Sequence, residues 1–434
     1  MFCRRLRRKT SRFSFVYAAC WSAAAWHHRQ LLPAAHAFVS AYAYAISCEN
    51  YHQHQLQTSS KIRSGWGHHG TSGTQQQSQG RRTFGVKQLN SSSSSTRQFL
   101  TRNDADNEST RMHAFETWRD GSEEVISKCV LPLSSKSHKG SSGRIGVLGG
   151  SAQFTGAPYY AAMASLKAGA DLAFVFCAEE ACLPIKCYSP ELMVTSIYSA
   201  SKFDELVATN QLESDEANKL VNKMVKKVTR MMNRLHVLII GPGLGRCPLV
   251  FTAVTQIIRE ARSQGIPLVL DADALFLLTQ EESYQNGLFH EPNCSTPYIL
   301  TPNVVEYNRL VESMPAEDYW KDAIICKKGA VDEIVHAASS AEPLRCSEAG
   351  GLKRSGGIGD VLAGTTGTLV AWNQIMSQQQ NADTTSKDLP LACWSACCFV
   401  KQATGRAYKV HGRAMTAPDV LDSLGPTVNE LTNV

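Results

Sequence analysis

Short apolar segments recur along the chain from residue 144 onward, and longer segments with helical spacing separate them. A short apolar run that ends in glycine or polar residues is typical of a buried strand, whereas apolar positions three and four apart indicate a helix. Some runs are apolar at every position, as in a parallel sheet that helices cover on both faces. The pattern therefore predicts an α/β domain with a mainly parallel central sheet. The predicted strands are residues 144–148, 172–177, 236–240, 265–270, 299–300 and 323–326.

Glycine or polar residues follow most of these predicted strands directly. In open α/β sheets, ligands bind outside the carboxyl ends of the strands, so we expect these segments to share one site. Any one of them alone could be an ordinary connecting loop. The segments are residues 241–245, Asp271 with Asp273, residues 301–303 and Lys328 with Gly329, which a glycine turn at residues 356–359 could join.

The glycine turn leads at once into an apolar segment with the spacing of a buried helix. Glycine permits positive φ and a close approach of ligand to backbone, and the free N–H groups at a helix start favour an anion. Asp360 falls in the first turn of this helix, beside the expected anion. A carboxylate there can act as the general base for a hydroxyl that is being phosphorylated. Asp is also a favoured N-cap residue, so both roles stay open.

The first hundred residues have a different composition. Residues 1–103 hold fourteen of the 44 basic residues but one of the 38 acidic ones, Glu49, which leaves 30 basic and 37 acidic residues in the remainder. An arginine-rich, serine-rich and nearly acid-free segment is typical of an organellar transit peptide, and its Gln/Ser/His/Gly-rich part cannot bury a core. We predict that residues 1–110 are a targeting presequence for a mitochondrion or plastid together with a disordered low-complexity segment, and that residues 111–434 are the folded domain. Plain disorder or a wrongly assigned start is the alternative.

Charge and cysteine content argue against several classes of protein. The net charge of +6 arises in the N-terminal segment, and the remainder is acidic, so no nucleic-acid partner is expected. The apolar run at residues 13–26 is too short to span a bilayer, and no membrane association is expected after presequence removal. The fourteen cysteines lack zinc-site spacing and are interpreted as reduced, mostly buried residues.

Several motifs stand in order between about residues 120 and 425, namely residues 146–151, 159–162, 188–192, 241–245, 271–275, 300–310, 327–329 and 356–364. In this combination they resemble the ATP- or ADP-dependent NAD(P)H-hydrate dehydratases, whose eukaryotic members are ATP-dependent. The resemblance implies a ribokinase-like fold in a single catalytic domain without a separate lid. It also implies repair of the S epimer of hydrated NADH or NADPH, coupled to ATP hydrolysis, in a protein that could be a homo-oligomer.

The resemblance also implies site residues, matched position by position. The hydrated dinucleotide would contact Gly245, Asn303, Val304, Val305, Glu306, Tyr307, Asn308, Arg309 and Asp360. ATP would contact Lys328, Gly329, Ala330, Val331, Asp332, Gly350, Gly351, Leu352, Lys353, Arg354, Ser355, Gly356, Gly357, Ile358 and Gly359.

Two departures from the family pattern stand out. The family commonly has Gln where this chain has Ile358, so a side-chain contact is lost while the backbone N–H groups of an anion hole remain. The Gln-rich residues 373–389 have no matching family segment and are interpreted as a surface insertion.

Phosphoryl transfer needs its developing charge neutralised, so Mg²⁺ is expected with ATP. Asn303 and Glu306 are candidate ligands, with substrate contact or helix capping as competing roles.

Two other functions fit parts of the sequence. A kinase of the hydroxymethylpyrimidine or hydroxyethylthiazole type would share the glycine turn and Asp360 but would not explain residues 188–191 or 303–309. A nucleotide-binding module without catalysis would not explain Asp360 beside the turn. Recovery of NADH absorbance, a stable phosphorylated product, or ATP binding without turnover would distinguish the three.

Overall fold

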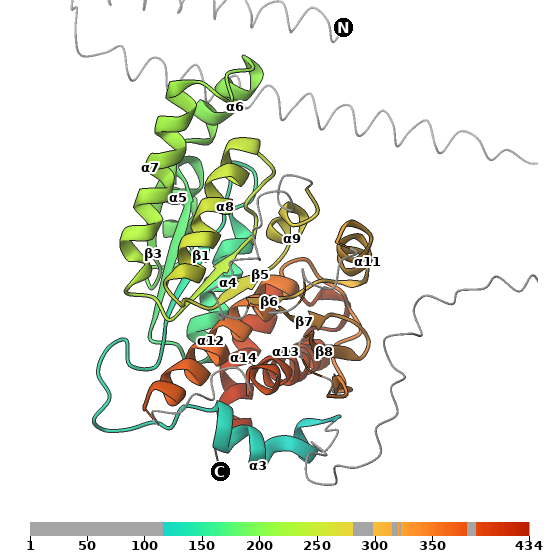
Figure 1. Cartoon of the computed structure of the whole chain (residues 1–434). Coiled ribbons are helices and arrows are strands. Elements are labelled where there is room, and N and C mark those ends of the chain that lie inside the picture. The colour runs from blue at the N-terminus through green and yellow to red at the C-terminus, as the bar shows by residue number, and fades with distance from the viewer. Residues whose placement is uncertain are drawn as a thin grey trace, which may run out of the picture. The chain divides into compact units, whose positions relative to one another are not determined.

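The computed structural model describes residues 116–280, 298–314, 320, 323–337, 339, 341–379 and 388–433 (Figure 1). All of these belong to one compact unit, Asp104–Val434. The predicted boundary at residue 110 lies outside the described residues. No helix in the described ranges is long and apolar enough to cross a membrane.

A nine-stranded sheet in the order β3-β2-β1-β4-β5-β6-β7-β8-β9 forms the centre of the fold. Pairing is parallel from β3 through β7 and antiparallel for β7–β8 and β8–β9, which confirms the predicted mainly parallel sheet. The sequence pattern did not indicate β3, β8 or β9. The strands are β1 Arg144–Leu148, β2 Leu172–Ala178, β3 Met193–Tyr198, β4 Val237–Ile240, β5 Leu268–Leu270, β6 Tyr298–Leu300, β7 Ala323–Lys327, β8 Asp332–His336 and β9 Leu344–Cys346.

Helices cover both faces of the sheet (Figure 1). On one face α4, α12, α13 and α14 pack together, with α12 against β1, β4 and β5, while α7 and α8 pack on each other on the opposite face. The helices are α3 Trp118–Cys129, α4 Gly156–Ala168, α5 Glu179–Tyr188, α6 Ala200–Ala208, α7 Asp215–Met232, α8 Pro248–Ser263, α9 Asp273–Leu277, α11 Val304–Ser313, α12 Ile358–Gln379, α13 Leu389–His411 and α14 Ala417–Thr432, with a 3₁₀ turn at Gly412–Ala414.

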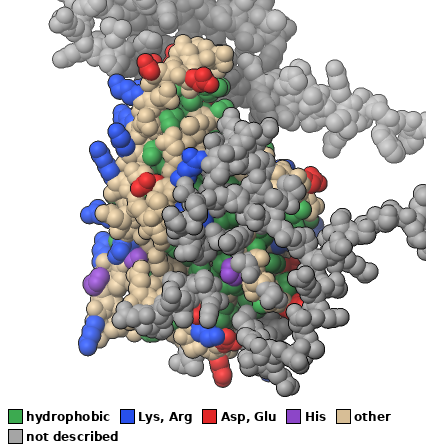
Figure 2. Space-filling model, viewed as in Figure 1, with side chains coloured by type: hydrophobic (Ala, Val, Ile, Leu, Met, Phe, Trp, Pro, Cys, Tyr) green, Lys and Arg blue, Asp and Glu red, His purple; other side chains and the backbone are tan. Residues whose placement is uncertain are grey.

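The polar stretch around residues 213–234 forms α7, which buries an apolar stripe including Val221, Met224 and Val228. Its other lysines and its arginine are exposed, whereas Lys227 is half-buried and donates to the Ser196 carbonyl at 2.8 Å. Basic side chains project from this side of the molecule (Figure 2). One side of the helix is therefore exposed to solvent and the other is buried, as its amphipathic pattern predicts.

The parallel strands end in register at one edge of the sheet. Leu148 pairs with Ile240, Ile240 with Leu270, and Leu270 with Leu300, so the loops after β1, β4, β5 and β6 leave the sheet side by side. The strand order reverses between β1 and β4, because β2 lies on the far side of β1 and β5 on the far side of β4. A crevice opens at such a switch point in doubly wound sheets.

Helix α12 lies unusually close to α4. A Cβ atom at Gly364 would lie 2.0 Å from the Ala161 carbonyl oxygen, so only glycine fits. Ser165 Oγ donates to the Gly364 carbonyl at 3.1 Å, and Thr368 Oγ1 donates to the Ser165 carbonyl at 3.0 Å. Small residues of α4, among them Ala161 and Ser165, therefore pack against the helix that carries Asp360.

The expected surface insertion at residues 373–389 is wrong for its first part and for its last residue, because Leu389 is buried at the start of α13. Residues 373–379 continue α12, and Asn373, Ile375, Met376 and Ser377 are buried because the helix extends across the core. Residues 380–387 lie outside the described ranges.

Gly364→Ala should lower the free energy of unfolding by about 3 kcal/mol, because the added methyl group forces the two helices apart. Urea unfolding followed by circular dichroism measures this. Gly356→Ala is the control, since a Cβ atom there meets nothing within 4 Å. Equal stability of both variants would contradict the close helix contact.

Candidate functional site

The turn before α12 is constrained to glycine at one position. Gly357 has φ +92°, and a Cβ atom there would lie 2.7 Å from Ala417 Cβ and 2.8 Å from the Tyr160 ring. Helix α12 begins at the next residue, and its first backbone N–H groups have no acceptor within the helix. The turn therefore presents donors suited to an anion.

Asp360 is the third residue of α12, so it lies inside the first turn and not at the N-cap. Burial raises its pKa to about 7; the nearby carboxylate of Asp271 adds to this, and the ammonium of Lys328 opposes it. A carboxyl group with a pKa near neutrality is suited to accept a proton at physiological pH. The geometry therefore favours the base role over the capping role.

Lys328 and Asp271 form an ion pair beside this helix start. Lys328 Nζ lies 2.8 Å from Asp271 Oδ1, which also accepts a hydrogen bond from Thr301 Oγ1 at 2.9 Å. Burial alone would lower the pKa of Lys328, but the Asp271 carboxylate outweighs it, and the pKa is raised. The lysine therefore stays cationic next to Asp360.

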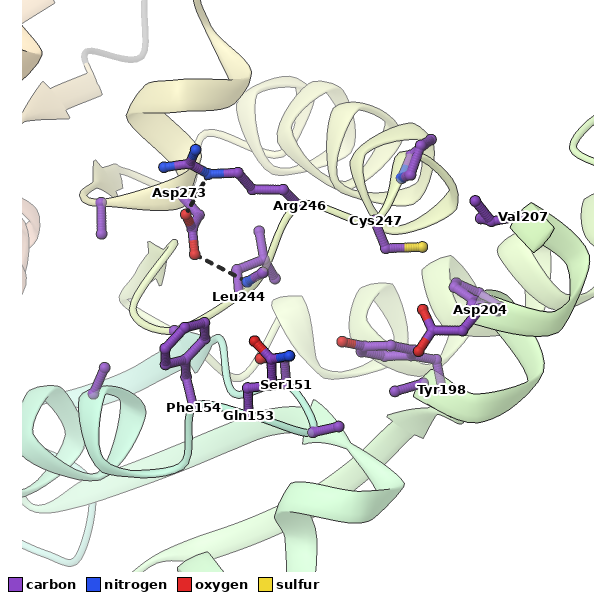
Figure 3. A pocket seen from close by; sticks show the side chains of 18 of the residues that line it. Ser151, Gln153, Phe154, Tyr198, Asp204, Val207, Leu244, Arg246, Cys247 and Asp273 are labelled. Carbon is purple, nitrogen blue, oxygen red and sulfur yellow. Dashed lines mark hydrogen bonds and ion pairs between the residues drawn. The ribbon is translucent and has the colours of Figure 1, made fainter. Parts of the chain in front are cut away.

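The second carboxylate of this loop, Asp273, braces the turn after β4. Its oxygens accept hydrogen bonds from the Gly245 N–H at 2.9 Å and from Arg246 Nε at 3.2 Å (Figure 3). The Arg246 guanidinium also lies 4.0 Å from the centre of the Phe276 ring. The backbone N–H of Gly245, a predicted substrate contact, is thus already paired within the protein.

A cavity of about 790 Å³ opens at the ends of β1, β4 and β5, at the switch point of the sheet. Gly245, Asp273 and Asp360 line it, so the structure brings two of the predicted substrate residues together at its wall. Figure 3 shows Tyr198 and Asp204 at one side and Asp273 with Arg246 at another.

Sequence reasoning did not select the rest of the cavity wall, which includes Ser151, Tyr198, Phe203, Asp204 and Cys247. Ser151 Oγ is buried and has no hydrogen-bond partner among the described residues. The switch-point rule applied to the glycine turn after β1 could have indicated Ser151. The residues on α6 carry no such signal, because they follow an unpredicted strand.

The predicted substrate segment at residues 303–309 forms the first turns of α11. Asn303 Oδ1 accepts from the N–H groups of Val305 and Glu306, and Glu306 Oε2 accepts from the Asn303 N–H, a reciprocal capping box. Val304 and Val305 are exposed, as are Asn308 and Arg309, and the Tyr307 ring lies 4.8 Å from Lys327 Nζ. None of the residues of this segment lines the cavity described above.

The predicted ATP segments approach the site from β7 and β9. Lys328 pairs with Asn303 across an isolated parallel bridge, and its Nζ lies 3.5 Å from the Cβ position of Gly359. Asp332 is buried and already engaged: it accepts from the Gly329 N–H at 2.8 Å and pairs with Lys401 at 3.4 Å.

The rest of the second ATP segment packs beside α13. A Cβ atom at Gly351 would lie 2.7 Å from the Thr404 carbonyl oxygen, and the Gly351 N–H donates to Thr404 Oγ1. Leu352 is exposed, and Arg354 donates a long hydrogen bond to the Gly351 carbonyl. These contacts hold residues 350–354 as a backbone strip that leads to the glycine turn.

The fold places the chain in a class of proteins. A solved ribokinase-like superfamily protein from Enterococcus faecalis superposes with a TM-score of 0.50 at 19% identity, over 71% of this chain and 94% of that one. The likeness confirms the ribokinase-like fold.

Sequence comparison then gives the family. Residues 145–425 match the family model described as NAD(P)H-hydrate dehydratase. The human ATP-dependent (S)-NAD(P)H-hydrate dehydratase is 34% identical over 323 residues, covering 71% of this chain and 84% of the human protein. The Phaeosphaeria nodorum protein of the same name is 38% identical over 312 residues, covering 68% and 89%. The chain belongs to the NAD(P)H-hydrate dehydratase family, as the sequence motifs predict.

Ala272, between the two aspartates, has φ +50° and ψ −114°, a backbone conformation that a side chain disfavours. Ala272→Gly should raise the free energy of unfolding by about 1 kcal/mol by relieving this strain. Urea unfolding measures the change. Ala274→Gly on α9, a helical residue with ordinary backbone geometry, should destabilise instead. A loss of stability in both variants would contradict strain at Ala272.

Proposed function

We propose that this protein uses ATP to dehydrate the S epimer of hydrated NADH or NADPH and so returns the reduced dinucleotide. The family of the chain and the names of its relatives support this reaction. The observation that carries the mechanism is Asp360, a carboxyl group with a pKa of about 7 at the wall of a cavity and at the start of a helix.

Phosphorylation makes the dehydration feasible, because hydroxide is a poor leaving group and phosphate is a good one. Asp360 takes the proton of the ring hydroxyl as its oxygen attacks the γ-phosphorus and the bond to ADP breaks. The lone pair of the ring nitrogen then expels phosphate, and loss of a proton from the neighbouring carbon restores the ring double bond. A general base of this kind contributes about 10²- to 10⁴-fold to the rate.

The glycine turn would stabilise the charge on the transferring phosphoryl group. The backbone N–H groups of Gly357, Ile358 and Gly359 are the donors, and each contributes about 3 kcal/mol in comparable oxyanion holes. Replacement of the usual Gln by Ile358 leaves these donors in place. The Lys328 ammonium adds positive charge on the adjacent side.

Mg²⁺ would enter with ATP. Among the described residues no group of three or more His, Cys, Asp or Glu side chains is placed to hold a metal ion. Mg²⁺ bound to nucleotides usually takes phosphate oxygens, waters and one or two carboxylates, which fits this sparse set. It supplies charge neutralisation on the triphosphate. Both candidates take part in the capping box, Asn303 through Oδ1 and Glu306 through Oε2. Glu306 is the better ligand of the two, because its carboxylate has a second oxygen.

The two substrates would bind on different sides of Asp360. The cavity with Gly245 would take the hydrated ring, and the exposed start of α11 would contact the remainder of the dinucleotide. The backbone strip at residues 350–354, the glycine turn that follows it and residues 328–332 would hold ATP, in part through backbone groups. Since Asp332 pairs with Lys401, its role there is to shape the loop.

The N-terminal segment lies outside the region that matches the family model. We propose that residues 1–110 direct import into a mitochondrion or plastid, on the strength of their basic, acid-poor composition.

Asp360→Asn should lower kcat for ATP-dependent dehydration about 1,000-fold, because the amide cannot accept the hydroxyl proton. The assay follows the return of reduced-nicotinamide absorbance from hydrated NADH and NADPH. The variant should be at least as stable as the wild type above pH 7, since a buried negative charge is removed. Near-normal turnover would exclude Asp360 as the base, and a stable phosphorylated product from the wild type would favour the kinase alternative.

The rate should fall tenfold for each pH unit below about 7, because a protonated Asp360 cannot act as a base. The raised pKa also means that the folded protein keeps a proton which the unfolded chain releases, so stability falls as pH rises from about 4 to 7. Measurement of kcat/KM for the hydrated dinucleotide at saturating ATP and Mg²⁺ tests the first effect. A rate independent of pH between 5.5 and 8 would contradict it.

A further inference from the structure

The loop after β5 carries two carboxylates that turn to different partners. Asp271 faces Lys328 and Thr301, whereas Asp273 faces Gly245 and Arg246. The residue between them, Ala272, has φ +50°. Strain at a non-glycine residue of this kind is retained where the surrounding contacts hold it in place, and such sites cluster around functional groups.

Lys328 is only partly enclosed by its partner. Asp271 has 3% of its side chain exposed, but Lys328 has 20%, and its Nζ lies 3.5 Å from the Cβ position of Gly359. An ammonium group has three donors, and among the described residues one is used, toward Asp271. The remaining donors are free to meet an anion beside the glycine turn.

We propose that Asp271 is a positioning residue for phosphoryl transfer: it holds the Lys328 ammonium between the glycine turn and Asp360, where the transferring phosphoryl group lies. The inference rests on the proposed function. Thr301 completes the arrangement, because its hydroxyl donates to the same oxygen that binds Lys328 and so fixes the rotamer of the carboxylate.

Asp271 has a second effect, on the base itself. Its charge repels the charged form of Asp360, so it keeps that group more basic, while Lys328 acts in the opposite direction. The charged groups that act on Asp360 are Asp271 after β5, Asp273 of α9, which pairs with Arg246, and Lys328 after β7, on which Glu306 of α11 also acts. Tyr160 of α4 and Ala417 of α14 pack on the neighbouring Gly357, and Asp419 of α14 pairs with His411 of α13.

The test compares Asp271→Asn with the wild type. The amide keeps the shape and can still accept from Lys328, but the charge is gone. We expect kcat to fall about 100-fold while KM for ATP changes less than threefold, and the acid limb of the pH–rate profile to move to lower pH. Lys328→Met should also lower kcat but move that limb to higher pH. The acid limb should therefore move in opposite directions in the two variants. A loss of folding would lower the rate in both without such a difference.

Two further variants separate charge from position. Asp271→Glu keeps the charge but displaces the ammonium, so kcat should fall about tenfold or more, and the limb should not move to lower pH as it does in Asp271→Asn. Asp332→Asn is the control, because it breaks the comparably buried pair with Lys401 and neither residue is among the groups that shift the pKa of Asp360. The acid limb should stay in place in this variant, whatever happens to the rate. Near-wild-type kcat in Asp271→Asn, or an unmoved limb in it, would overturn the proposal.

A readout without turnover distinguishes this inference from the proposed function. Carbon-13 NMR of aspartate carboxyl groups, with the Asp360 signal assigned by its loss in Asp360→Asn, reports the pKa of Asp360 directly. It should be lower in Asp271→Asn and higher in Lys328→Met. If the wild type titrates in this way but never restores NADH absorbance, the proposed reaction fails. If the pKa of Asp360 is the same in all variants, the role of Asp271 fails, whatever the reaction.

Discussion

The close contact between α4 and α12 is the constraint on which the site depends. Gly364 lets the two backbones approach to a distance that no side chain permits, and Ser165 and Thr368 fasten them by hydrogen bonds. Because α12 also packs on β1, β4 and β5, this contact fixes where the helix begins. Asp360 and the glycine turn therefore stand over the strand ends without any loop having to hold them there.

The second constraint is the common edge at which the strands end. Three carboxylates and one lysine meet there, and burial makes each charge expensive unless it is opposed. Asp271 and Lys328 neutralise each other, and Asp273 is shared between Gly245 and Arg246. Asp360 is the group left with conflicting neighbours, and the balance places its pKa close to neutrality. The basicity of Asp360 is thus a property of the whole strand edge.

The sequence was sufficient for the parts of the site that lie where an apolar run ends. Residues 241–245, Asp271 and Lys328 follow buried strands, so the rule for parallel sheets brought them together correctly. The sequence was insufficient where the order of the strands determines which side chains form an ion pair. Asp271 pairs with Lys328 because β6 lies between β5 and β7. Tyr198 ends β3, and Phe203 and Asp204 follow on α6; the mixed exposure of β3 hides it as a strand. The capping role of Asn303 was left open because residue type cannot distinguish a cap from a ligand.

A dehydratase on this fold needs few groups of its own, and the structure explains why. Once the hydroxyl carries phosphate, the ring nitrogen supplies the electrons that expel it, so the elimination needs no separate strong acid. The demanding step is the transfer, which requires a base, a set of donors and a cation on one phosphoryl group. Asp360, the N–H groups of the turn and Lys328 fit those three roles and lie within one strand edge. The same set would serve a kinase. In the proposed reaction the outcome therefore depends on the substrate, because only a ring with an adjacent nitrogen lone pair can lose the phosphate it receives.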